Sequence, residues 1–128
     1  MDSTQQEIVN EIKASMAPKS RKPLSSSLFI RAWLRRHEEA CIWDMFDEYK
    51  KLLIELNPTY HMPSYPYFRV VIYTLRKRGL IENTRTEPPI KRISPLQFDR
   101  QYVKITHDDE STNDLWRSPI ESFRGTKQ

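Results

Sequence analysis

The segment 64–82, SYPYFRVVIYTLRKRGLIE, constrains the fold most, because it predicts where a helix begins, which face is buried and where it ends. Ser64 is a suitable N-cap, and Pro66 is tolerated in the first turn, where its missing N–H costs nothing. Gly79 stands at the position expected just after a helix, and the Leu-Ile pair that follows favours a strand. The positions predicted to be buried recur at spacings of three and four. They are Phe68, Val71, Ile72 and Leu75.

Two helical stretches are predicted before this segment. The first covers residues 28–39, with Ser27 as its expected cap. The second runs from about Ala40 to Leu56 and carries a strong apolar stripe, which Asn57-Pro58 ends. The pattern is compatible with one long helix or with two helices separated near residues 37–40.

The N-terminal region predicts a short amphipathic helix over residues 4–16, followed by a loop rich in proline, serine and basic residues. A short helix seldom stays alone in solution. Its apolar stripe is expected either to pack on its own domain or to pair with a second chain as a homodimer. The stripe consists of Ile8, Val9, Ile12 and Met16.

After Gly79 the pattern changes to a strand over residues 80–84, a loop over 85–100 and a strand over 100–106. This order predicts a hairpin with a large basic tip. The polar tail 107–128 follows, with Trp116, Ile120 and Phe123 as its large apolar residues. These side chains are expected either to dock on the domain or a partner, or to belong to a loosely held tail.

The order helix, helix, turn, helix ending at glycine, strand, basic loop and strand resembles the winged-helix (winged helix-turn-helix) domain of DNA-binding regulators. The resemblance spans residues 24–106, and its most specific unit is Leu75, Gly79, Leu80 and Ile81. It implies a mainly α domain with a small β-hairpin, an α+β fold. Three segments follow: an N-terminal helix with a basic linker (1–23), the winged-helix domain (24–106) and a C-terminal tail (107–128).

Charge is segregated along the chain. The protein has 21 lysines and arginines against 17 acids, a net charge of +4, and an isoelectric point near 9.3. Residues 64–80 contain four basic residues and no acid, whereas residues 38–56 contain six acids against two lysines. A basic helix beside an acidic one favours a polyanionic partner for the basic helix.

The helix from Ser64 is therefore the candidate recognition helix for double-stranded DNA, because an α-helix fits the major groove and its first residues usually reach base edges. Tyr65 and Tyr67 alternatively complete the edge of the core. The candidates on this helix are Ser64, Tyr65, Tyr67, Arg69, Tyr73, Arg76 and Lys77. The candidates in the hairpin, as a wing on the DNA backbone or in the minor groove, are Arg85, Lys91, Arg92 and Arg100. The arm Lys19, Arg21 and Lys22 is interpreted first as an ordinary basic linker.

The sequence gives little support for a metal site, a catalytic site or a small-molecule site. His37 and Cys41 have metal-binding spacing on a helix, but a core cysteine beside a surface histidine is the favoured interpretation. The acidic run 108–110 is interpreted as a solvated turn. With two glycines and no catalytic or nucleotide-binding motif, no enzyme activity, cofactor, metal or small-molecule ligand is expected. A single cysteine and a polar N-terminus predict a cytoplasmic protein without a membrane segment.

The sequence thus predicts a double-stranded DNA-binding protein, either a transcriptional regulator or a DNA-organising factor, with a possible homodimer through the N-terminal helix or the C-terminal tail. The alternative is a winged-helix module that binds protein within a larger complex. The acidic second helix and the apolar residues of the tail favour that alternative, and the basic, aromatic third helix favours DNA.

Overall fold

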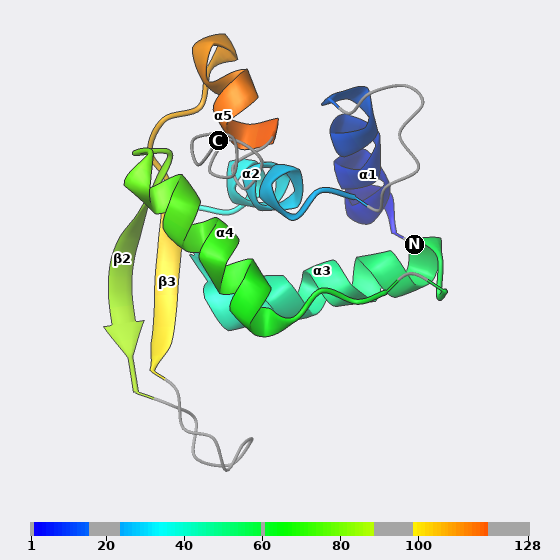
Figure 1. Ribbon diagram of the computed structural model, residues 1–128, viewed down its shortest axis with the longest axis horizontal. Coiled ribbons are helices and arrows are strands. Elements are labelled where there is room, and N and C mark those ends of the chain that lie inside the picture. The colour runs from blue at the N-terminus through cyan, green and yellow to red at the C-terminus, as the bar shows by residue number, and fades with distance from the viewer. Residues whose placement is uncertain (1, 16–23, 60, 89–98, 118–128) are drawn as a thin grey trace, which may run out of the picture.

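The computed structural model describes residues 2–15, 24–59, 61–88 and 99–117, which form a mainly helical α+β fold (Figure 1). The predicted candidates Lys19, Arg21, Lys22, Lys91 and Arg92 lie outside the described residues, as do Met16, Ile120 and Phe123. The helices are α1 (Ser3–Ser15), α2 (Ser26–Arg36), α3 (Ile42–Leu56), α4 (Tyr65–Lys77) and α5 (Asn113–Arg117), with a 3-10 turn η1 (Glu110–Thr112). The strands are β1 (Ala40–Cys41), β2 (Ile81–Glu87) and β3 (Arg100–Ile105).

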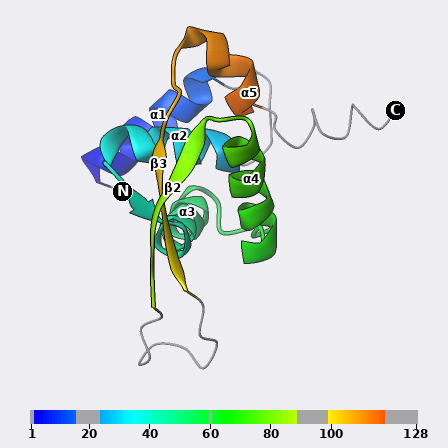
Figure 2. The same cartoon turned by 90° about the vertical axis from the view of Figure 1, so that its left-hand side faces the viewer.

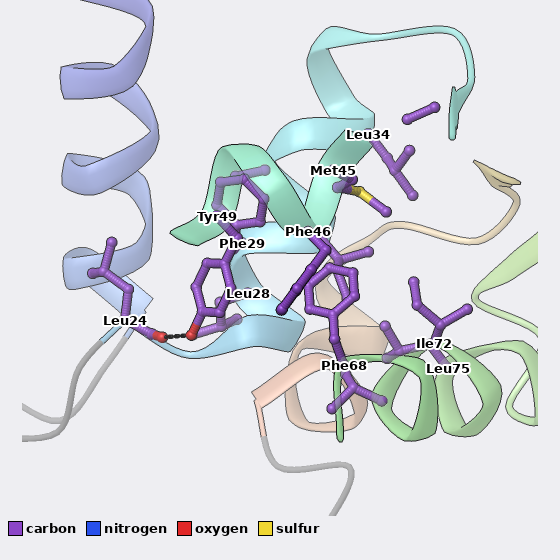
Figure 3. Packing of buried hydrophobic residues seen from close by; sticks show 14 of the residues in the cluster. Leu24, Leu28, Phe29, Leu34, Met45, Phe46, Tyr49, Phe68, Ile72 and Leu75 are labelled. Atoms are coloured by element: carbon purple, nitrogen blue, oxygen red, sulfur yellow. Dashed lines mark hydrogen bonds between the residues drawn. The ribbon is translucent and has the colours of Figure 1, made fainter. Parts of the chain in front are cut away.

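The core lies between α2, α3 and α4, where aromatic rings from each helix meet (Figure 3). Phe29 of α2 packs on Tyr49 of α3 at 5.0 Å between ring centroids, and Phe46 of α3 packs on Phe68 of α4 at 5.3 Å. The Tyr49 hydroxyl donates a hydrogen bond to the Leu24 carbonyl, which satisfies the polar end of a buried ring. Burial raises the pKa of the Tyr49 phenol.

The two predicted helices before residue 57 are separate, and a short strand lies at the break. Ala40 pairs with Val103 and Cys41 with Tyr102, so β1 adds a third strand to the predicted hairpin. The sheet is antiparallel with β3 in the centre, in the order β1-β3-β2. A two-residue strand has no local pattern, and only its partner β3 makes it one.

The first of these helices begins earlier than predicted. Ser25, not Ser27, is the N-cap of α2, and its hydroxyl accepts from the Leu28 amide at 3.4 Å. Ser27 is instead a buried residue of the first turn and donates a hydrogen bond to the Trp116 carbonyl. The earlier start places Ser27 and Leu28 on the buried face of the helix.

The predicted ends of α4 are confirmed. The Ser64 hydroxyl accepts from the Tyr67 amide at 3.2 Å, and Gly79 has a φ of 76°, in the left-handed region that glycine adopts without penalty. The Leu80 amide returns to the Leu75 carbonyl at 3.1 Å, which closes the helix and turns the chain into β2. That strand extends to Glu87, beyond the predicted end at residue 84, because β3 pairs with it across a bulge between Asn83 and Arg85.

Both ends of the described chain pack on α2. The predicted stripe residues Ile8, Val9 and Ile12 of α1 are each 1% exposed, so α1 packs on its own domain. Trp116 of α5 is fully buried, and this part of the tail docks on the domain. No helix within the described ranges combines the length and the apolar character needed to span a lipid bilayer.

Candidate nucleic-acid interface

The side of α4 that points away from the core is exposed and largely aromatic and basic. The buried side carries Phe68, Val71, Ile72 and Leu75, as the sequence predicts. We define the outer face of α4 as the opposite side, which consists of Pro66, Tyr67, Arg69, Val70, Tyr73 and Lys77. Three of its large side chains are unusually open to solvent: Tyr67 is 44% exposed, Val70 51% and Tyr73 50%. Exposed apolar and aromatic side chains that cluster in this way mark interaction surfaces.

The basic residues of α4 contact aromatic rings and neutral groups. The guanidinium of Arg69 lies 6.0 Å from the Tyr65 ring, and the ammonium of Lys77 lies 5.3 Å from the Tyr73 ring. Arg76 donates to the Asn83 side chain of β2 at 2.9 Å. Within the described ranges, Arg69, Arg76 and Lys77 form no ion pair, so their positive charge is not neutralised there.

The arginines of the described hairpin strands, by contrast, are held by acids. Arg85 bonds Glu39 at 2.7 Å, and hydrogen bonds from Thr84 and Arg85 lower the pKa of the Glu39 carboxyl. Arg100 contacts Asp44 at the start of α3 at 3.0 Å. The predicted wing residues Arg85 and Arg100 therefore join the loop end of the hairpin strands to the acidic region before and within α3.

The basic residues of α2 are also paired. Arg31 and Arg35 both contact Asp108, which follows the sheet, and Arg36 contacts Glu11 of α1 at 3.3 Å. The predicted solvated turn at residues 108–110 is thus partly an anchor for α2. The described residues contain no cluster of three potential metal ligands.

The two tyrosines at the start of α4 lie in different environments. Tyr65 is half-buried and completes the edge of the core, with its ring 5.2 Å from Phe46 and 4.7 Å from Trp43. Burial raises the pKa of the Tyr65 phenol despite the nearby charge of Arg69. Tyr67 points outward, while the Ser64 hydroxyl serves the helix as its cap.

Two exposed residues next to the predicted DNA-binding candidates were not among those candidates. Val70 lies in the middle of the outer face of α4, and Trp43, 46% exposed, lies at the start of α3 beside Tyr65. Helical spacing could have identified Trp43, because it falls outside the stripe that contains Met45 and Phe46. Cys41 is a core residue as favoured, and His37 is exposed and stacks on Trp33 at 4.2 Å.

Helix α4 and the hairpin lie next to each other on one side of the molecule. Figure 2 shows α4 beside β2 and β3, with α3 behind them, and the bond from Arg76 to Asn83 joins α4 to β2. A single elongated partner could contact α4 and the hairpin together. Comparison of the chain with protein-family models, with curated proteins and with solved structures finds no match.

Proposed function

We propose that this protein binds double-stranded DNA through the outer face of α4, in a winged-helix arrangement. The order α2, β1, α3, α4, β2, β3 and the sheet order β1-β3-β2 are compatible with that fold. In this arrangement α4 is the recognition helix, and the hairpin is the wing.

The observation that carries the proposal is the uneven distribution of unpaired positive charge. Arg69, Arg76 and Lys77 have no acidic partner among the described residues, whereas the arginines of α2 and of the described hairpin strands are paired. DNA presents a dense row of phosphates that such a helix would neutralise. The aromatic residues between the cations supply contacts to sugars and base edges.

Each residue has a role in this proposal. Arg69, near the start of α4, reads guanine through its two-pronged guanidinium. Tyr67 and Tyr73 bond phosphates or pack on sugars, and Arg76 and Lys77 contact phosphates at the other end of the helix. We assign Arg85 and Arg100 to positioning the hairpin, because Glu39 and Asp44 hold them. The biological role that fits is transcriptional regulation or DNA organisation.

The test is fluorescence anisotropy with a random duplex of about 30 base pairs, titrated with salt. We expect binding that falls steeply with salt, and a slope reduced by about one in Lys77→Ala, since one phosphate contact is lost. Lys13→Ala is the matched control, because Lys13 is an exposed lysine on α1. No binding at low salt, or an equal effect of Lys13→Ala, would overturn the proposal.

Arg69→Ala should weaken binding to a selected site more than binding to random DNA, because a base contact discriminates among sequences. Affinities of wild type and variant for a site-selected duplex and a random duplex provide the measurement. An unchanged affinity for both duplexes would show that Arg69 is not in the groove.

A second candidate is a protein-binding module. The exposure of Trp43, Val70 and Tyr73 beside the cations favours it, because aromatic and basic residues are also enriched in protein interfaces. Absence of DNA binding in the salt titration would turn the same surface into the expected contact for an acidic protein.

A further inference from the structure

The centre of the outer face of α4 is apolar. Pro66, Val70, Tyr73 and Lys77 are spaced by four, three and four residues, which places them in one stripe along the helix. All four are exposed, and Val70, at 51%, lies in the middle of the stripe. If α4 enters the major groove, Val70 in the middle of this stripe faces the floor of the groove, where the base edges are, while the long side chains of Tyr73 and Lys77 reach out to the backbone.

The same face lacks the side chains that read adenine or cytosine by paired hydrogen bonds or by accepting from the cytosine amino group. Residues 64–80 contain no Asn, Gln, Asp or Glu, the types that bond adenine or cytosine. Thr74 has a hydroxyl, but it donates to the Val70 carbonyl at 2.9 Å within the helix. Base readout along the stripe must therefore rely largely on apolar contact, with Arg69 at its flank.

One feature of the major groove suits an apolar side chain, the C5-methyl group of thymine. We propose that Val70 is a specificity-determining residue that packs against thymine methyl groups, so that this protein prefers duplexes with thymine at the corresponding positions. The inference rests on the proposed function and adds to it the class of sequence that α4 reads.

The charges around Val70 favour DNA over a protein as the group that covers it. Arg69 and Lys77 flank it on the same helix, and neither has an ion pair within the described part of the chain. A polyanion with methyl groups on the floor of its groove complements both the cations and the apolar centre.

The experiment compares two duplexes that differ only in that methyl group. The full chain is titrated against alternating d(AT) and d(AU) duplexes of about 30 base pairs at fixed low salt. We expect about fourfold weaker binding to d(AU) for each methyl contacted, the factor that follows from losing one buried methyl group. Val70→Ala should show a smaller preference for d(AT) than wild type, because the shorter side chain buries less of each thymine methyl group. Alanine is a strong helix former, so the variant should fold.

Ile54→Ala is the matched control, because Ile54 is a β-branched residue of α3 that is 52% exposed. It should keep the full preference for d(AT). Equal binding of wild type to d(AT) and d(AU) would overturn the inference and leave the proposed function standing. Full preference in Val70→Ala, or lost preference in Ile54→Ala, would overturn the assignment to Val70. No binding to any duplex would overturn the proposed function itself.

Discussion

At the scale of single residues, Arg31 shows how this small domain buries a charge. It is 5% exposed and donates to Asp108 and to Asn113, both at 2.8 Å, while its guanidinium lies 5.5 Å from the Trp116 ring. A buried cation is tolerated when its donors have partners. Arg31 therefore joins α2 to the segment that carries α5.

Arg31→Met should lower the free energy of unfolding by about 3 kcal/mol, because Asp108 and Asn113 lose a partner inside the protein. Urea denaturation at neutral pH measures the loss. Arg117→Met is the control, since within the described part of the chain Arg117 forms only an exposed pair with Asp114, and its loss should change the free energy of unfolding by less than about 0.5 kcal/mol. Equal losses in the two variants would contradict this account of Arg31.

Asp108 should make the free energy of unfolding depend on pH in the acid range. Burial opposes its ionisation, but hydrogen bonds and charges from Arg35 and Arg31 outweigh burial and lower the pKa below its ordinary value of 3.8. A carboxyl whose pKa is lower in the folded than in the unfolded protein stabilises the fold at pH values above its unfolded pKa. That stabilisation is lost as the pH falls through its folded pKa. Unfolding followed from pH 6 down to about pH 2 should show a shallower acid loss in Asp108→Asn than in wild type. Identical profiles would refute the role of Asp108.

At the scale of elements, α4 is the part whose ends matter most for the candidate interface. Its first turn is capped by Ser64, and Gly79 turns the chain into β2. These two ends determine how α4 sits beside the hairpin, and hence which residues a partner meets. Both lie at positions where a single side chain decides the local conformation.

Ser64→Ala should cost about 1 kcal/mol through the lost cap. Gly79→Ala should lower the free energy of unfolding by about 1–2 kcal/mol, because alanine is strained in the left-handed conformation. No steric clash adds to this loss, because no atom lies within 4 Å of an added Cβ. Thermal and urea unfolding measure both changes. Gly79→Asn is the control, because asparagine adopts the left-handed conformation more readily than alanine, and it should lower the free energy of unfolding less than Gly79→Ala. A much larger loss in Gly79→Ala would indicate a steric clash instead.

At the scale of the whole molecule, α1 and α5 belong to the same core as the three central helices. Ile8, Val9 and Ile12 join the cluster that includes Trp116. The stripe that suggested a homodimer through the N-terminal helix is therefore already covered by the domain itself. Dimerisation stays a prediction, without that stripe as its surface.

Ile12→Ala should lower the free energy of unfolding by about 2–5 kcal/mol, because it opens a cavity in this core. The transition midpoint should not change with protein concentration, since the contact lies within one chain. Lys13→Ala, the exposed neighbour, is the control and should be nearly neutral. A midpoint that rises with concentration would restore the dimer hypothesis for α1.

The fold could be predicted from sequence wherever the determining contacts are local. The ends of α4, its buried face and the two strands of the hairpin follow from caps, spacing and β-favouring residues within a few positions of each other. The basic character of α4 is likewise a property of consecutive residues. Val70 and Trp43 could have been added to the candidate site by the same spacing rule.

Tertiary structure decided the contacts between residues that are distant in sequence. Strand β1 exists because Ala40 meets Val103, and the charge of Arg85 is neutralised because Glu39 lies beside it. Burial of Arg31 likewise depends on Asp108. Periodicity and capping act within a turn or two of helix, whereas these pairs are brought together only when the core packs. The sequence by itself thus determined the ends of α4, the two strands of the hairpin and the basic character of α4, and packing decided which cations of the described residues remain unpaired.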